Sequence, residues 1–389
     1  MGLIFAPCYP RIVLPQSGIE ERGVALTEPI QFFLPGPSYV SSDVRQAMTK
    51  PMAGHRSAAF KELYVSLAAR LPKVFRTAGD VMIATGSSTL IMESAVVSCV
   101  ERHVLNVTNG AFSERWHAIS KSVGKAADTV AVPWGHAVDP ELVRAALRRK
   151  RYEAVTLVHN ETSTGAMSPL AEIARVIREE SEALILVDSV SSLGGARIET
   201  DDWGLDVVLA GTQKALALPP GLTLFALSRR AAERAAKVPH RGFYTDLLRY
   251  RDKHREGGFI TTPAIPLIYA LDLQLDRVLA EGMEARWARH QRLYRQTAEW
   301  AAARGCDYAS APDARSMTVS CLKAPAGVDP QTLVRELGRR GFTIGGGYGD
   351  WKPTTFRIGH MGEVRASDLE TLLAEIDQVL ETAAAQAVR

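Results

Sequence analysis

Short apolar runs alternate with amphipathic stretches between residues 81 and 227. The runs are five or six residues long, rich in β-branched side chains and almost free of polar interruptions, and they cover residues 81–85, 104–108, 154–159, 183–188, 206–210 and 222–227. Such runs are typical of strands that are buried on both faces of a sheet. Their alternation with helical patterns predicts an α/β fold, in which helices cover both sides of a mostly parallel sheet.

Several helix starts are marked by a polar residue before proline or by a capping pattern. Asp139, Ser168 and Asp329 each precede a proline, which predicts a capping residue followed by proline at the first helical position. Ser367 and Glu370 have the spacing of a capping box, which predicts the start of the last helix.

The pattern changes near residue 280, where a long charged helical stretch begins that ends at Gly305. Short strand patterns then alternate with helices. We predict three parts: an irregular proline-rich arm over residues 1–45, a large domain over 46–280 and a small C-terminal α+β domain over 281–389. The arm is expected to pack across a domain or subunit boundary.

Composition narrows the class of protein. The 389 residues include 46 Lys and Arg against 43 Asp and Glu, and a net charge of +3 gives no reason to expect a nucleic-acid partner. No window resembles a membrane-spanning helix, so no membrane contact is expected, and the N-terminus lacks the basic region of a signal peptide. The four cysteines are scattered, which predicts neither a metal site nor a disulfide framework. We therefore expect a cytoplasmic enzyme.

Polar or glycine-rich clusters follow the predicted strands directly. In an open parallel sheet the carboxyl ends of the strands share one edge, and that edge carries the ligand. Convergence of several clusters on one site is stronger evidence than any single motif. The clusters are Gly86-Ser87-Ser88-Thr89, Asn109 to Phe112, Asn160 to Gly165, Asp188 to Ser192, and Gly211-Thr212-Gln213-Lys214.

The first cluster leads from a strand into a helix, so it places free backbone N–H groups and hydroxyls at a helix N-terminus. That arrangement suits a phosphate. The chain has neither a P-loop nor a dinucleotide-binding G-x-G-x-x-G after a strand. Taken alone, the cluster is more typical of a Ser- or Thr-capped helix that binds nothing.

Asp188 and Lys214 end two successive strands of the same predicted edge. Taken singly, Asp188 could be a helix cap or part of a structural ion pair, and Lys214 could be a surface residue. A lysine desolvated in such a crevice can act as a nucleophilic amine. Together with Phe112 and the phosphate cup, the pair meets the needs of pyridoxal phosphate: a Schiff-base lysine, a carboxylate for the pyridinium nitrogen and an aromatic ring for stacking.

At this point the sequence resembles the class V, fold type I pyridoxal-phosphate aminotransferases, in the alanine–glyoxylate and serine–pyruvate branch. The resemblance begins near residue 30 and covers nearly the whole remaining chain. The matching stretches are FFLPGPSYV (32–40), GHRSAAF (54–60), ATGSSTLIMES (84–94), NGAFSERW (109–116), HNETSTGAMSPL (159–170), LVDSVSSLGG (186–195), GTQKALALPPG (211–221), TTPAIPLIYAL (261–271) and FRIGHMG (356–362).

The resemblance implies a role for individual residues. Lys214 would form the Schiff base and then move the proton, and Asp188 would keep the pyridine nitrogen protonated. Arg357 would bind the substrate α-carboxylate, beside the backbone of Gly36. Phe112 would stack on the cofactor ring. The remaining cofactor-binding residues would be Thr162 at the phenolic oxygen side, Ser87, Ser88, Thr89 and Gln213 at the phosphate, and Thr262, which would reach the phosphate from the partner subunit.

Some positions depart from the family pattern or have two interpretations. Phe259 stands where some relatives place a tyrosine that contacts the phosphate across the dimer, and Ser88 replaces a common glycine. His55 and Arg56 could lie near the partner's site or form a buried structural pair. The glycines from 345 to 349 predict a flexible loop over the site mouth, and we expect the 345–355 loop and the N-terminal arm to determine the substrate.

The resemblance thus implies a homodimeric aminotransferase with shared active sites. It would move an amino group from alanine or serine to glyoxylate or pyruvate in a ping-pong reaction through pyridoxamine phosphate. Aspartate and ureidoglycine remain alternative donors. A lyase such as a cysteine desulfurase on the same fold is a second hypothesis, with Cys306 and Cys321 as candidate thiols, and a non-catalytic binding protein is a third.

Overall fold

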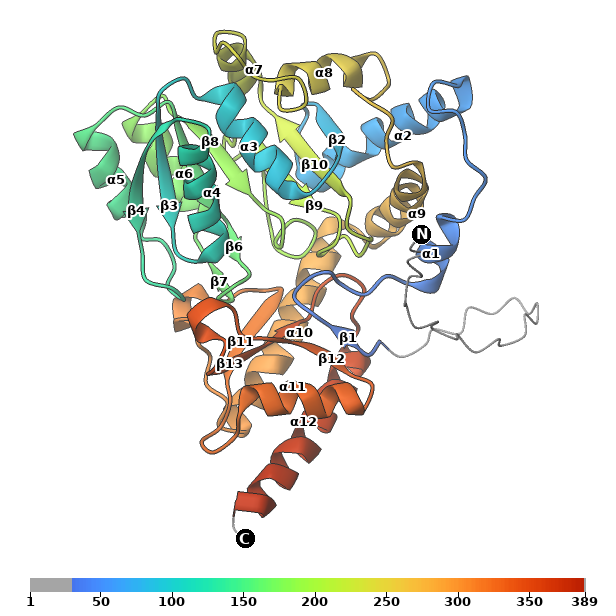
Figure 1. Cartoon of the computed structure of the whole chain (residues 1–389), viewed down its shortest axis with the longest axis vertical. Coiled ribbons are helices and arrows are strands. Elements are labelled where there is room, and N and C mark those ends of the chain that lie inside the picture. The colour runs from blue at the N-terminus through green and yellow to red at the C-terminus, as the bar shows by residue number, and fades with distance from the viewer. Residues whose placement is uncertain (1–29, 388–389) are drawn as a thin grey trace, which may run out of the picture.

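A seven-stranded sheet forms the centre of the larger part of the molecule (Figure 1), in a computed structural model that describes residues 30–387. Its strand order is β2-β10-β9-β8-β5-β3-β4, and only β10 among these strands runs antiparallel to its neighbours. The predicted mostly parallel α/β sheet is therefore confirmed. The strands are β2 (Val81–Thr85), β3 (His103–Thr108), β4 (Ala126–Ala131), β5 (Ala154–Val158), β8 (Leu184–Asp188), β9 (Val207–Gly211) and β10 (Leu222–Leu227).

Two hydrophobic cores cover the two faces of this sheet. Side chains alternate between them along each strand: in β8, Leu184 and Leu186 face one core, whereas Ile185 and Val187 face the other. The first core is closed by α3 (Ser88–Cys99), α4 (Ala111–Ser122), α7 (Arg229–Ala235) and α8 (Leu247–Arg255). The second is closed by α2 (Ala58–Phe75), α5 (Pro140–Arg149), α6 (Leu170–Glu180) and α9 (Ile265–Glu281).

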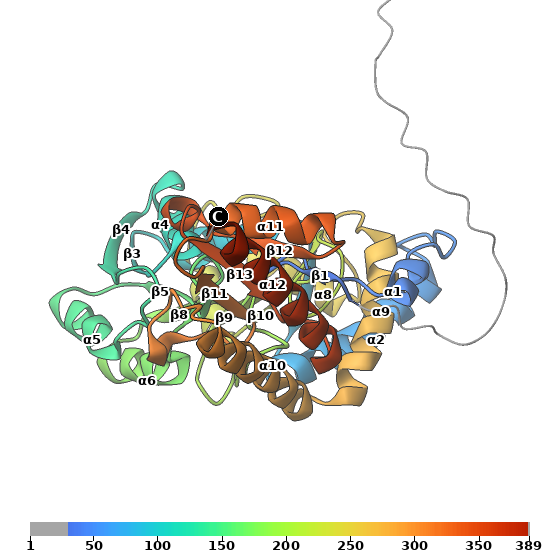
Figure 2. The same ribbon diagram turned by 90° about the horizontal axis from the view of Figure 1, so that it is seen from below.

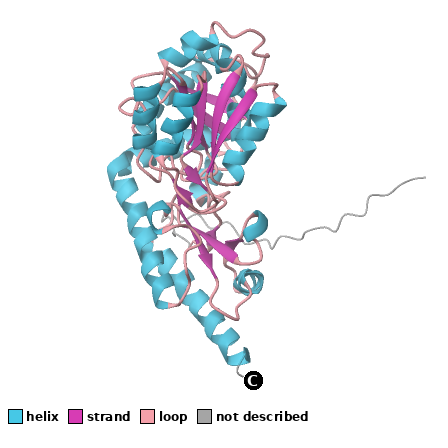
Figure 3. Ribbon diagram, turned by 90° about the vertical axis from the view of Figure 1, so that its left-hand side faces the viewer, coloured by secondary structure: helices cyan, strands magenta, loops and turns pink. Residues whose placement is uncertain are grey.

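A second, four-stranded sheet lies below the first (Figure 3). Its order is β1-β12-β13-β11, and Figure 2 shows the helices that surround it. The strands are β1 (Phe32–Phe33), β11 (Val319–Lys323), β12 (Thr343–Gly346) and β13 (Thr355–Gly359), and the helices are α10 (Met283–Ala303), α11 (Pro330–Arg339) and α12 (Ala366–Ala387). Shorter elements are α1 (Ser42–Ala47), β6 (Asn160–Glu161), β7 (Ala166–Met167), η1 (Pro312–Ala314) and η2 (Gly349–Trp351).

The predicted arm is only partly described. Residues 1–29 lie outside the described residues, and β1 joins the small sheet by parallel pairing with β12. The domain boundaries near residues 45 and 280 stay predictions. No helix among residues 30–387 is both long and apolar enough to cross a membrane.

Two of the four predicted helix starts are confirmed and two are wrong. Asp139 and Asp329 cap α5 and α11, each accepting hydrogen bonds from the first helical amides. Ser168 does not cap α6, which begins at Leu170, because its hydroxyl accepts from the amide of Val138 instead. The capping box at Ser367 also fails: α12 begins one residue earlier, and Asp368 rather than Glu370 accepts from the Arg365 amide.

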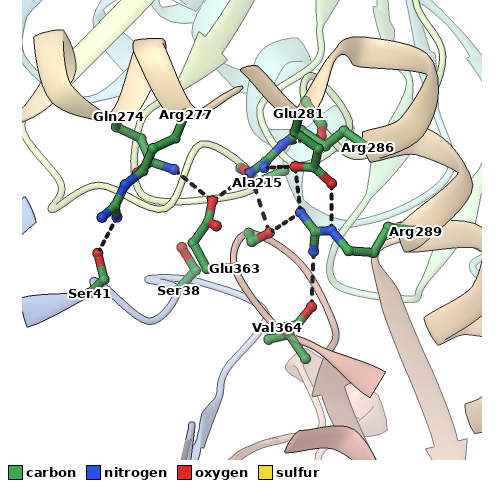
Figure 4. Close-up of polar contacts among 12 residues, drawn as sticks. Ser38, Ser41, Ala215, Gln274, Arg277, Glu281, Arg286, Arg289, Glu363 and Val364 are labelled. Carbon is green, nitrogen blue, oxygen red and sulfur yellow. Dashed lines mark hydrogen bonds and ion pairs between the residues drawn. The ribbon is translucent and has the colours of Figure 1, made fainter. Parts of the chain in front are cut away.

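The two sheets are tied together beside the junction of α9 and α10. Gly282 separates these helices, and the fully buried guanidinium of Arg286 lies just after it. Arg286 Nη2 donates to the carbonyl of Ala215 (2.7 Å), and Nη1 pairs with Glu281 (2.6 Å) (Figure 4). Nη2 also reaches Glu363, after β13 (3.1 Å). One buried cation therefore joins the loop that carries Lys214 to the small sheet.

Candidate active site

A cavity of about 180 Å³ opens at the carboxyl edge of the seven-stranded sheet. Loops that follow β2, β5, β8 and β9 contribute its walls, as expected for an open parallel sheet. The cavity brings together eight of the residues predicted to form the site: Ser87, Ser88, Thr89, Phe112, Thr162, Asp188, Gln213 and Lys214. Its other lining residues are Met92, Arg115, Val158, Asn160, Val190 and Ser191.

The cluster predicted to bind a phosphate after β2 lies at the N-cap and first turn of α3. Ser87 is the N-cap residue, but its side chain makes no capping hydrogen bond among the described residues, which favours a ligand cup over a self-capped helix. Gly211, at the end of β9, lies against the cup. A Cβ there would come within 2.7 Å of both Ser88 Oγ and Gln213 Oε1, so the backbone must approach these two polar groups closely.

Asp188 ends β8 with a buried carboxyl group. Its Oδ1 accepts the amide of Val190 (2.8 Å), and no Lys or Arg among residues 30–387 forms an ion pair with it. Burial raises the pKa of Asp188 to about 7, helped by the nearby Glu161 carboxylate and opposed by the Val190 amide. A cation brought to this carboxylate would relieve the desolvation cost, so the position suits a protonated pyridine nitrogen.

Lys214 projects into the same cavity from the loop after β9, and its Nζ donates to the carbonyl of Pro35 (2.6 Å). Burial, and to a smaller extent the positive charge of Arg357, lower the pKa of Lys214 to about 8, against the opposing effect of Asp188. The segment around Gly36 lies directly against this amine, since a Cβ at Gly36 would overlap with it. An amine with this pKa is available as a nucleophile near neutral pH.

Arg357 lies in β13, and two carbonyls fix its guanidinium. Nε donates to Gly346 (2.8 Å) and Nη1 to Thr162 (3.0 Å), so the small sheet presents the cation to the loop after β5. Within residues 30–387, Nη2 makes no hydrogen bond in the structure. The fork is therefore held in place while donor capacity remains for a carboxylate.

Glu161 positions Phe112, the residue expected to stack on a ring. Its fully buried carboxylate accepts the amides of Phe112 (3.1 Å) and Ser113 (3.0 Å), as well as the Ser113 hydroxyl (3.1 Å). These are the free donors at the start of α4, where a negative charge is favourable. Arg115 stacks on the Phe112 ring, with 4.8 Å from Cζ to the ring centre.

Other predicted positions lie apart from this cavity. Thr262 is exposed and does not line it. The Phe259 ring packs within its own chain, 4.8 Å from the centre of the Tyr64 ring. Arg56 is exposed and His55 is half-buried, so the interpretation of these two as a buried structural pair is wrong.

Sequence reasoning missed several residues of the site. Glu161 stands in the Asn160–Gly165 cluster that the sequence singled out, and a carboxylate among hydroxyls directly after a buried strand was an available signal. Asn160 and Ser191 come from the same clusters; Asn160 Nδ2 donates to Ser191 Oγ (2.9 Å), and Thr162 Oγ1 donates to the same oxygen (2.7 Å). No sequence signal placed Tyr348 beside Phe112.

Comparison with known proteins settles the family. A family model described as aminotransferase class-V matches residues 81–378. The chain belongs to the class-V aminotransferases. The aminotransferase is 38% identical to an uncharacterized aminotransferase of Methanocaldococcus jannaschii over 90% of this chain and 92% of that one, and 33% identical to a serine–glyoxylate aminotransferase of Methylorubrum extorquens over 90% of both.

A solved structure supports the same assignment. The alanine–glyoxylate aminotransferase of Nostoc sp. has 30% identity and a TM-score of 0.86 over 93% of this chain and 98% of that one. Because the match spans both sheets, the predicted class and the predicted enzyme type are confirmed: the chain is a pyridoxal-phosphate-dependent aminotransferase.

Proposed function

We propose that this aminotransferase moves the amino group of alanine or serine to glyoxylate or pyruvate, with pyridoxal phosphate held in the cavity at the sheet edge. One observation carries the proposal: the Lys214 amine, with its lowered pKa, lies in one cavity with the Asp188 carboxyl and close to the guanidinium of Arg357. These groups supply a nucleophilic amine, a partner for a ring nitrogen and a carboxylate-binding fork.

The residues of the cavity fit the cofactor. Ser87, Ser88, Thr89 and Gln213 would hold the phosphate at the start of α3, where free amides and hydroxyls converge. Asp188 would hold the protonated ring nitrogen, since its buried carboxyl has no ion-pair partner among the described residues. Phe112 would stack on the ring, and Thr162 would lie at the phenolic oxygen side.

The chemistry divides between cofactor and protein. When bound, pyridoxal phosphate draws electrons away from the Cα–H bond of the amino acid, which makes that proton acidic. Lys214 Nζ would hold the cofactor covalently before the reaction and move the Cα proton during it. Arg357 would fix the α-carboxylate, and Asp188 would keep the ring nitrogen protonated. The donor product would leave before the acceptor binds, which gives ping-pong kinetics.

One observation supports small substrates. The printed names of the Methylorubrum and Nostoc relatives pair serine and alanine with glyoxylate. Cysteine desulfuration has no such support: Cys306 and Cys321 are buried, and burial raises the pKa of each thiol to about 11, far from a reactive thiolate.

We also propose that the enzyme is a homodimer, in which Thr262 of the partner subunit completes the phosphate site. Thr262 is exposed and lies outside the cavity of its own chain. Met52 and Phe243 expose 68% and 59% of their surface, which is high for such apolar side chains and favours a covered surface. Two measurements test this proposal. Sedimentation of the holoenzyme should give the mass of a dimer, and Thr262→Ala should weaken the binding of pyridoxal phosphate.

The decisive experiment is the visible absorption spectrum of the holoenzyme during titration with single amino acids. We expect the cofactor band to bleach with alanine or serine and to return with glyoxylate or pyruvate. Lys214→Ala is the control, and its turnover should fall by about 10²–10⁴-fold or more because the proton carrier is lost. A wild-type spectrum that no amino acid changes, or comparable turnover in the Lys214 variant, would contradict the proposal.

A further inference from the structure

The connection between β12 and β13, residues 347–354, packs through two tryptophans against the loop that follows β4 of the large sheet. The Trp351 and Trp134 rings meet edge to face, with 6.0 Å between their centres. Trp134 is held in turn by α4, because its Nε1 donates to Glu114 (2.7 Å). Close packing extends to the backbone: a Cβ at Gly135 would come within 2.6 Å of the Trp351 ring. The connection therefore has a defined place on the large sheet.

The flexible loop predicted for residues 345–349 is wrong in part. Gly345 and Gly346 belong to β12 and pair with Arg357 and Phe356 of β13. Gly349 starts the short helix η2, which ends at Trp351. Only the residues between these two elements are free of regular structure, and Tyr348 is one of them.

The Tyr348 ring contacts the two side chains that frame the proposed substrate position. Its centre lies 5.8 Å from the centre of the Phe112 ring and 5.5 Å from Cζ of Arg357. The ring thus spans from the proposed cofactor-stacking residue to the proposed carboxylate-binding residue. It also supports the guanidinium face, while the carbonyls of Gly346 and Thr162 fix the guanidinium edge.

We propose that Tyr348 selects substrates by the size of their side chain. The inference rests on the proposed function, since it takes Arg357 as the carboxylate-binding residue. A substrate held there by its carboxylate has its Cα between Arg357 and Lys214, and the space toward Phe112 is filled by the Tyr348 ring. Amino acids with a side chain as small as alanine or serine fit, and those with an aromatic or long branched side chain are excluded.

The experiment compares alanine with phenylalanine as donors to the holoenzyme. The single-turnover bleaching rate per substrate concentration is measured for the wild type, Tyr348→Ala and Tyr348→Phe, with Asp350→Ala as a control in the same loop. The preference for alanine should fall by about tenfold or more in Tyr348→Ala, a size effect typical of apolar pockets. It should stay close to the wild-type value in Tyr348→Phe and in the control.

A binding measurement without turnover separates selection from general damage. Dissociation constants of propanoate and 3-phenylpropanoate are measured by calorimetry on each holoenzyme. Tyr348→Ala should strengthen binding of 3-phenylpropanoate relative to propanoate. An equal change for both acids, an unchanged alanine preference, or a lost preference in Tyr348→Phe would overturn the inference. If no amino acid bleached the cofactor band of the wild-type holoenzyme, the proposed function would be overturned instead.

Discussion

The carboxyl edge of the large sheet and the β12–β13 connection both face the proposed substrate, but they are built in different ways. At the sheet edge, Asp188 and Lys214 are placed by their own strands, β8 and β9, which pair directly in the sheet. In the connection, Tyr348 is placed by a contact between Trp351 and Trp134, which lie far apart in the sequence.

This difference separates chemistry from selection. Asp188 and Lys214, which we propose to act on every substrate, follow strands of the large sheet, where packing on both faces restricts movement. The group that we propose to distinguish substrates stands in a surface connection, where a change in sequence disturbs few buried contacts. Mutations at the sheet edge should therefore lower turnover with every substrate, whereas mutations in the connection should change the preference among substrates.

Among variants that keep Lys214, the largest effect is expected for Asp188→Asn at the sheet edge. Without the carboxylate, the ring nitrogen loses its charged partner, and turnover should fall by about 10²–10³-fold, the cost of removing one key electrostatic contact in other enzymes. Steady-state kinetics with alanine and glyoxylate measure the loss. Asp202→Asn, on the surface, is the control and should keep wild-type turnover.

The same substitution should stabilise the protein once the cofactor is removed. Because the pKa of Asp188 is raised in the folded state to about 7, from 3.8, folding favours the protonated carboxyl, and this contribution is lost as pH rises between these values. The difference in melting temperature between the Asp188→Asn apoprotein and the wild-type apoprotein should therefore grow in favour of the variant from pH 4 to pH 7, by roughly 2 °C or more. A constant difference across this range would contradict the assigned pKa.

A smaller effect is expected for Glu161→Gln, which tests how strongly the edge holds Phe112. The amide keeps the shape but loses the charge and one acceptor for the first amides of α4, so unfolding should become easier by about 1–3 kcal/mol. Urea unfolding measures this change. Glu172→Gln, an exposed change in the first turn of α6, is the matched control. An equal decrease in the free energy of unfolding in both variants would show that the buried contacts of Glu161 stabilise the fold no more than an exposed glutamate in a first helical turn.

The smallest effect is expected in the β12–β13 connection. A double-mutant cycle of Trp134→Leu and Trp351→Leu should give a coupling free energy of about 0.5–1.5 kcal/mol from urea unfolding, the range for aromatic pairs. Trp134 with Trp300 is the control pair, since Trp300 donates instead to Asp377 and the two should be additive. A coupling near zero between Trp134 and Trp351 would mean that the connection is held by other contacts.

Sequence reasoning succeeded where a local pattern determines the outcome. The strands buried on both faces were found at their observed places because burial demands a continuous apolar run, and the strand-end clusters met because parallel strands share an edge. The edge strand β4 was missed, since its half-exposed sequence AADTVA has no such run. Asp139 also capped as predicted, because an N-cap hydrogen bond stays within one turn.

Sequence reasoning failed where a contact between residues far apart in the chain determines the partner of a side chain. Ser168 has a capping sequence, yet its hydroxyl is taken by the Val138 amide from another segment. Glu161 was passed over because its partners are the amides of α4, about 50 residues earlier in the chain. Tyr348 lies further still from Phe112 along the chain, and no local pattern encodes that meeting.

The pairing of β12 with β13 has a practical consequence for enzyme engineering. Residues 347–354 leave and return at adjacent antiparallel strands, with Gly346 opposite Phe356, so they form an interchangeable hairpin tip. Tips of other sequence and length that keep the Trp351 contact could be grafted there without moving Lys214, because insertions in such surface loops disturb little of the fold. A library of grafted tips would turn one catalytic scaffold into a series of transaminases with graded donor scope.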